Sequence, residues 1–221
     1  MKKLFQISSS SLFAFVLSCC MLTATSAAEQ FVEAKHFTRL PTPLTHDAGD
    51  RVDVVEFFSL ACPHCADLDP YLHKWTSNRP SSVRFRRVPV PFHTTWVPLS
   101  KAYFILETMK REDLVPKAFE AVHGAGAQLK DEASFLVWAE KNGLNAASIK
   151  EQWNSFDMNL KLKRAEALTK QYNVQSVPMI FVDGKFAVQS TSEASRGTVA
   201  HRDIAAVLDQ MIEKAMMERK R

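Results

Sequence analysis

The sequence of 221 residues is poor in the residue types that mark several special classes of protein. It has only 6 glycines and 10 prolines and no low-complexity tract, which excludes a collagen-like or intrinsically disordered chain. Its 4 cysteines are too few for a scaffold held together by disulfides, so their positions matter more than their number. Hydrophobic residues make up 46% and charged residues 24%, which indicates an ordinary buried core.

A strong excess of either charge is also lacking. The net charge is +4, and this mildly basic balance gives no reason to expect a nucleic-acid partner. The sequence shows no internal repeat. Its length suits one domain, or one domain that carries a large insertion.

The apolar run near the N-terminus, Leu12–Leu22, is shorter than a membrane-spanning helix. Its 11 residues fall short of the roughly 20 that such a helix needs, but they match the roughly 7–15 of a signal-peptide core. Two lysines precede the run, and small residues at 26–28 allow cleavage before Glu29. We therefore predict that residues 1–28 are a secretory signal, cleaved near Ala28.

Two other interpretations of this segment stay open. It could remain uncleaved as an anchor, which its serines and threonines disfavour, or Val16–Cys19 could be a lipoprotein cleavage box that leaves Cys19 lipidated. Removal of residues 1–28 would leave Cys62 and Cys65 as the only cysteines. Export would place this pair in an oxidising compartment.

The first part of the mature chain has a strand–helix–strand pattern. Residues 52–58 are rich in β-branched and aromatic residues, as in a buried strand, and residues 83–88 alternate as in a half-buried strand. Between them we expect a helix that begins at Cys62, with apolar residues at helical spacing up to Trp75. The pattern favours a mixed sheet covered by helices. The basic residues at 84–87 are expected on a solvated face or edge of that sheet.

The middle of the chain is expected to be entirely helical. Apolar residues recur at helical spacing from Trp96 to Phe156, and a lysine-rich helix follows up to about Tyr172. The simplest explanation is a bundle of helices whose apolar faces form a core.

The last part returns to strands. Two apolar runs, 178–182 and 185–188, flank Asp183-Gly184, which is a strong hairpin signal. A terminal helix follows, and residues 218–221 are expected to be its frayed, solvated end.

The motif Cys62-Pro63-His64-Cys65 lies at the junction between the first strand and the helix. If Cys62 is the N-cap, Pro63 takes the first helical position, where its missing N–H costs nothing. The sulfur of Cys62 then faces the free N–H groups of His64 and Cys65, and these donors and the helix dipole stabilise a thiolate. Cys65 lies one turn on, roughly 5–6 Å away and within disulfide reach. We therefore predict an exposed, attacking Cys62 and a more buried, resolving Cys65, with His64 adding a donor and, when protonated, a positive charge.

Two other roles for the cysteines are weaker. An inert structural bridge would close so small a ring that it would gain little chain entropy. A zinc site with Cys62, His64 and Cys65 as ligands would need further Cys or His ligands, and the sequence offers none nearby.

The ordered set of motifs resembles the DsbA family, the thiol:disulfide interchange proteins of bacterial periplasms. The resemblance covers the whole mature chain. It rests on Glu56–Ser59, the CPHC motif at 62–65, Val88–Phe92, and Val177-Pro178 ahead of a strand and a hairpin.

The resemblance implies a thioredoxin fold, an α/β architecture with a mixed central sheet flanked by helices, interrupted by an inserted helical domain. The implied boundaries are 29–92 for the first part of the thioredoxin-like domain, 93–165 for the insertion and 166–221 for the second part.

The resemblance also implies roles for residues around the motif. It implies a cis peptide bond before Pro178, in a loop where Val177 and Pro178 bind a substrate strand. Glu56 matches an acid that lies behind the second cysteine and exchanges protons with Cys65. The alternative for Glu56 is a tolerated charge at a strand end.

Some positions depart from the family pattern or from particular relatives. Ser176 replaces a common glycine and Ala66 stands where an aromatic residue is frequent, both at the rim of the site. Val177 differs from the threonine usual in isomerase-like relatives. Residues 29–50 cannot supply the dimerisation domain of those relatives, so we expect a monomer.

The sequence therefore predicts a periplasmic dithiol oxidase that donates the Cys62–Cys65 disulfide to newly exported, unfolded proteins with free thiols. The resemblance implies re-oxidation by a DsbB-like, quinone-linked membrane partner, and the chemistry needs no bound cofactor or metal. The alternatives are a disulfide isomerase or reductase of the same fold, or a non-enzymatic zinc- or peptide-binding module. The other histidines show no pairing pattern and are expected in surface or core positions; they are His36, His46, His73, His93, His123 and His201.

Overall fold

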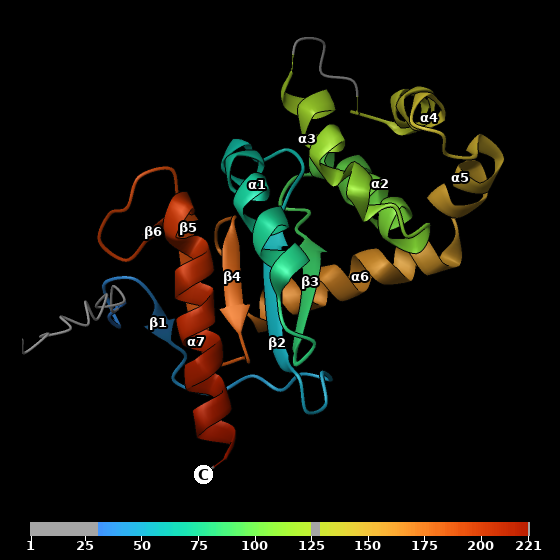
Figure 1. Cartoon of the computed structure of the whole chain (residues 1–221). Coiled ribbons are helices and arrows are strands. Elements are labelled where there is room, and N and C mark those ends of the chain that lie inside the picture. Colours follow the sequence, from blue (N-terminus) through green and yellow to red (C-terminus); the bar gives the residue numbers. More distant parts are fainter. Residues whose placement is uncertain (1–30, 125–128, 221) are drawn as a thin grey trace, which may run out of the picture. The chain divides into compact units, whose positions relative to one another are not determined.

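A mixed sheet forms the centre of the computed structural model, which describes residues 31–124 and 129–220. Within these residues, six strands follow the order β1-β5-β4-β2-β3, with β6 paired to β5 (Figure 1). The parallel pairs are β2 with β3 and β5 with β6, and the other neighbours are antiparallel. The strands are β1 Thr38–Arg39, β2 Val52–Phe58, β3 Val83–Pro89, β4 Met179–Val182, β5 Phe186–Thr191 and β6 Val199–Ala200. The predicted signal segment lies outside the described residues.

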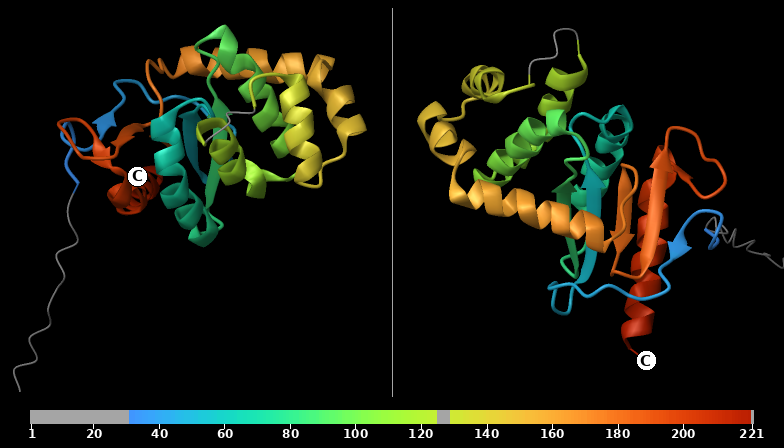
Figure 2. Two further views of the ribbon diagram at one scale, coloured as in Figure 1. Left: turned by 90° about the horizontal axis from the view of Figure 1, so that it is seen from above. Right: turned by 180° about the vertical axis from the view of Figure 1, so that it is seen from behind.

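Helices cover both faces of the sheet. The helices α1 and α7 pack on one face, and α6 crosses the other (Figures 1 and 2). The α-helices are α1 Pro63–Asn78, α2 Val97–Thr108, α3 Val115–His123, α4 Glu132–Lys141, α5 Ala146–Trp153, α6 Phe156–Gln171 and α7 Ile204–Arg219. The short 3₁₀ helices are Thr94–Trp96, Glu112–Leu114 and His201–Asp203. Within the described residues, no helix is both long and apolar enough to cross a membrane.

The sheet is interrupted in the chain by a run of helices, as the sequence predicts. Helices α2 to α6 all lie between β3 and β4. The domain boundaries remain predictions, and the one expected between residues 165 and 166 falls inside α6.

The central strand β2 divides the core into two layers. All of its side chains are buried, because its neighbours β3 and β4 and helices on both faces enclose it. Val52 and Val54 belong to the cluster shared with α1 and α7, whereas Val55 and Phe57 belong to the cluster shared with α6. Since side chains alternate along a strand, Glu56 points to the same face as Val54, toward α1.

The predicted hairpin between β4 and β5 is confirmed. Asp183 and Gly184 both have positive φ, +56° and +60°, in the three-residue turn that joins Val182 to its partner Phe186. Any side chain at position 184 would overlap the carbonyl oxygen of Leu44, so only glycine fits there.

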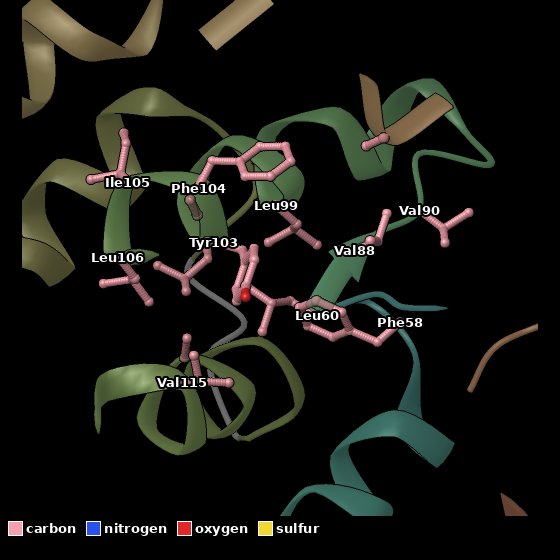
Figure 3. Close-up of a cluster of buried hydrophobic side chains, with 14 of the residues drawn as sticks. Phe58, Leu60, Val88, Val90, Leu99, Tyr103, Phe104, Ile105, Leu106 and Val115 are labelled. Atoms are coloured by element: carbon pink, nitrogen blue, oxygen red, sulfur yellow. The ribbon is translucent and has the colours of Figure 1, made fainter. Parts of the chain in front are cut away.

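One apolar cluster joins the end of the sheet to the helical insertion (Figure 3). Phe58 and Leu60 come from β2 and the loop after it, and they lie in the same cluster as Tyr103 of α2 and Val115 of α3. The rings of Phe58 and Tyr103 are 4.9 Å apart at their centroids in an edge-to-face arrangement. The loop after β2 and the insertion therefore share one core.

The prediction of a frayed, solvated end at 218–221 is wrong for Glu218 and Arg219. Arg219 forms an ion pair with Asp183 and donates hydrogen bonds to the carbonyl oxygens of Asp50 and Arg51, over 2.8 Å and 3.0 Å. Glu218 pairs with Arg39 over 2.6 Å. Tertiary contacts thus hold the last turn of α7 in place.

Candidate active site

The CPHC motif and the proline loop meet at one edge of the sheet. The motif follows the carboxyl end of β2, and Val177-Pro178 precedes β4, which is antiparallel to β2. The pairing of Phe57 with Met179 therefore brings the two segments together. The sulfur of Cys62 lies 3.5 Å from the carbonyl oxygen of Val177.

Cys62 begins helix α1 as the sequence predicts. It has the extended backbone of an N-cap, with φ −90° and ψ 115°, and Pro63 follows in the first turn. The amides of Cys65 and Ala66 donate to the Cys62 carbonyl oxygen, each over 3.1 Å, and so start the helix.

The expected order of burial holds, but Cys62 is less exposed than predicted. Cys62 is 6% exposed and Cys65 is fully buried. The carbonyl of Val177 lies against the Cys62 sulfur. The sequence places Val177 115 positions away, so the helix start alone could not reveal this cover.

The two thiols, both free in this structure, differ strongly in acidity. A hydrogen bond from Cys65, then the N–H groups of Cys65 and His64 and the charge of His64, lower the pKa of Cys62 to about 7 against the opposing effect of burial. The sulfur of Cys62 accepts no N-cap hydrogen bond from these N–H groups. They therefore stabilise its thiolate through their electrostatic field. Burial, the nearby Cys62 and the charge of Glu56 raise the pKa of Cys65.

The loop before β4 has the conformation that the resemblance implies. The peptide bond between Val177 and Pro178 is cis, and Pro178 is buried. The ladders of β4 with β2 and β5 both end at Met179, so the backbone of Val177 lies beyond them. Ser176, which departs from the family pattern, accepts a hydrogen bond from Gln189 over 3.2 Å.

A buried charged cluster lies beneath α1. Arg87 donates from Nε to Glu56 over 2.7 Å and from Nη2 to Asp69 of α1 over 2.6 Å. Glu56 is 1% exposed. Burial raises its pKa, the charge of Arg87 opposes this, and the charge of Asp69 adds to it. Two acids thus share one guanidinium at the back of Cys65.

The prediction that the basic residues at 84–87 are solvated is wrong for Arg87. Strand β3 is at the edge of the sheet, as expected, but its register places Arg87 directly beside Glu56. Arg84 and Arg86 pair instead with the buried Asp53, over 2.8 Å and 3.0 Å. Sequence reasoning missed Arg87 and Asp69, although pairing the two predicted strands could have placed Arg87 opposite Glu56.

His64 is exposed beside the buried cysteines. Across residues 31–124 and 129–220, no group of three histidine, cysteine or acidic side chains is placed to hold a metal ion. The site contains two thiols, one with a lowered pKa and one with a raised pKa, together with an exposed histidine and a buried acid.

Comparisons with known proteins match this arrangement. Residues 53–196 match the model of the DSBA-like thioredoxin domain family. The chain is 29% identical over 206 residues to the thiol:disulfide interchange protein DsbA of Bordetella parapertussis, covering 92% of this chain and 97% of that protein. It is also 29% identical over 189 residues to DsbA of Pseudomonas syringae, covering 85% and 86%. The crystal structure of Pseudomonas aeruginosa DsbA superposes with a TM-score of 0.78 at 25% identity, covering 86% and 97%.

Proposed function

Because the chain belongs to the family of DSBA-like thioredoxin domains and is a thiol:disulfide oxidoreductase, we propose that it is a dithiol oxidase. In its oxidised form a Cys62–Cys65 disulfide is donated to exported proteins that have free thiols. The asymmetry between the two thiols carries this proposal, since the pKa of Cys62 is lowered to about 7 while that of Cys65 is raised.

The reaction begins with attack on Cys62. A thiolate of the client attacks the Cys62 sulfur, the Cys62–Cys65 bond breaks, and a mixed disulfide forms between Cys62 and the client. A second client thiolate then attacks the client sulfur of this mixed disulfide. The client gains a disulfide, and Cys62 leaves as a thiolate that the start of α1 stabilises. Two electrons pass from the client to the enzyme.

Glu56 is the residue that we assign to the proton of Cys65. In the first step Cys65 leaves as a buried thiolate, which needs a proton because burial disfavours its charge. Burial also raises the pKa of Glu56, so this carboxyl holds a proton more readily than an exposed one. The charge of Glu56 also raises the pKa of Cys65, so the two groups interact electrostatically.

Val177 and Pro178 are the residues that we assign to client binding. The backbone of Val177 lies beyond both ladders of β4 and faces the sulfur of Cys62. An extended client segment can pair with such a backbone, which would align its cysteine with Cys62. Pro63 and His64 border the same sulfur and tune its acidity.

The redox equilibrium of the Cys62–Cys65 pair with glutathione tests the proposal. A strongly oxidising pair is expected, because a stabilised thiolate is a good leaving group. A reducing pair would instead support a reductase or isomerase of the same fold. A protein without redox activity that binds one equivalent of zinc would support a binding module.

Action on exported proteins requires that this chain be exported itself. We propose that residues 1–28 direct it to the periplasm and that a quinone-linked membrane oxidase of the DsbB type re-oxidises it there. The mature protein is then expected to begin at Glu29. Intact mass of the protein purified from the periplasm measures this, and an acylated Cys19 would show a lipoprotein instead.

A further inference from the structure

His123, the last residue of α3, contacts the loop that leads to Cys62. Its Nε2 atom lies 2.8 Å from the carbonyl oxygen of Leu60, two residues before Cys62. We propose that His123 is a positioning residue that holds this loop where α1 best stabilises the Cys62 thiolate. This inference rests on the proposed function, in which Cys62 is the sulfur that the client attacks and that then leaves as a thiolate.

The chemistry of the contact fixes the role of the histidine. A carbonyl oxygen only accepts, so Nε2 must carry the hydrogen. Both the neutral ring with hydrogen on Nε2 and the protonated ring can donate, so the bond does not require a charged histidine. The ring also stacks on Phe119 one turn earlier, with centroids 6.3 Å apart and planes 23° from parallel. Phe119 is buried in the insertion, so its stacking restricts the position of the His123 ring.

Leu60 is fixed at both its side chain and its carbonyl. Its side chain is buried in the cluster with Phe58 and Tyr103 (Figure 3). The neighbouring residues are bonded to Ser59. Its hydroxyl accepts from the amide of Ala61 over 3.1 Å, and its carbonyl oxygen accepts from the amide of Cys62 over 3.0 Å. These bonds leave the Leu60 carbonyl to His123. The peptide group between Leu60 and Ala61 is therefore held by Ser59 at its N–H and by the insertion at its carbonyl oxygen.

Loss of this bond should change the acidity of Cys62. Without His123, the peptide group after Leu60 is held only through its N–H, which Ser59 binds. The Cys62 sulfur then loses part of its alignment with the N–H groups of His64 and Cys65. The thiolate is then less stable, and the disulfide becomes less oxidising. One ordinary hydrogen bond corresponds to a change of about 2- to 10-fold in an equilibrium constant.

Two variants separate the donor from the ring. His123→Phe provides an aromatic ring that can stack on Phe119 but has no N–H donor. His123→Gln provides an N–H donor but no aromatic ring. Thiolate absorbance against pH and the glutathione equilibrium are measured for both. We expect His123→Phe to titrate at a higher pH and to be about 2- to 10-fold less oxidising, while His123→Gln stays near wild type. His73→Phe, on the exposed surface of α1, is the matched control and should change neither quantity.

The outcomes distinguish this inference from the proposed function. If His123→Phe titrates like wild type, or if both variants shift equally, the donor does not position the loop and the inference is wrong. A loss of stability that is equal in both redox forms, without a thiolate shift, would likewise overturn it. If the wild-type Cys62 itself titrates like an unfolded cysteine, the proposed function fails instead.

Discussion

The Nε atom of Arg87 donates a hydrogen bond to Oε2 of Glu56 over 2.7 Å, behind the helix that carries both cysteines. The same guanidinium also binds Asp69. Since two buried acids share one base, the cluster keeps a net negative charge unless one acid is protonated. Burial raises the pKa of Glu56, so this carboxyl takes up a proton more readily than an exposed glutamate does.

Removal of the shared base should therefore destabilise the fold. Arg87→Met leaves Glu56 and Asp69 buried without a partner, and we expect a loss of about 3–5 kcal/mol near neutral pH. Arg87→Lys keeps the charge and should lose less. Chemical denaturation measures both. Arg202→Met is the control, because Arg202 is 70% exposed and lies 3.8 Å from its acid. A loss no larger than that of the control would show that the cluster does not stabilise the fold.

The roles of the two cysteines predict opposite behaviour in trapping experiments. Cys65→Ser should accumulate mixed disulfides with clients, since Cys62 can still be attached to a client but has no neighbouring thiol to release it. Cys62→Ser should trap few or none, because its remaining thiol is fully buried and only weakly acidic. Non-reducing electrophoresis of cell extracts measures the adducts. Equal trapping by both variants would contradict the assigned order of attack.

Reduction near neutral pH should stabilise this protein, in contrast to a structural disulfide. The pKa of Cys62 is lowered to about 7 in the folded state, against about 8.5 in an unfolded chain. The Cys62 thiolate thus contributes to the stability of the reduced form above the unfolded pKa, and this contribution is lost as pH falls through about 7. The advantage of the reduced form should grow by about 1 kcal/mol between pH 6 and pH 8.

The trend should reverse at higher pH because of the second thiol. The pKa of Cys65 is raised by burial. Its unfolded form ionises above about pH 8.5, while its folded form does not, so the reduced protein loses stability there. Denaturation midpoints of both redox forms at several pH values test this pattern. An oxidised form that is more stable at pH 7 would rule it out.

Replacement of His64 should make the Cys62–Cys65 pair only partly less oxidising. The charge of His64 lowers the pKa of Cys62, but less than the hydrogen bond from Cys65 and the backbone N–H groups do. His64→Ser keeps the helix start, so the Cys62 pKa should rise by a fraction of a unit and the pair should become less oxidising. Thiolate absorbance and the glutathione equilibrium check this on the same samples. If neither changes, the start of the helix alone accounts for the acidity of Cys62.

The parts of the fold that were predictable depend on local chemistry. Residues 52–58 form a strand because most of them are β-branched or aromatic, and the N-cap position of Cys62 follows from Pro63 in the first turn. The turn at Asp183-Gly184 requires positive φ, which the sequence signals directly. In each case the residues that decide the structure are neighbours in the chain.

The parts that were missed depend on register and on distant packing. Arg87 is buried because β3 pairs with β2 at Glu56 and because Asp69 of α1 completes its environment. Cys62 is covered by Val177 from the loop before β4. A single sequence gives the spacing within an element but not which distant element lies against it.

Arg219 also has a consequence for the order in which the chain can fold. Its carbonyl partners at residues 50 and 51 precede it by 169 and 168 positions. Contacts between residues so far apart in sequence form late, because closing a long loop costs entropy that only many simultaneous contacts repay. We therefore expect the residues just before β2 to become fixed only once the last turn of α7 has formed. We expect the folding rate to be limited by this long-range closure rather than by the formation of its helices.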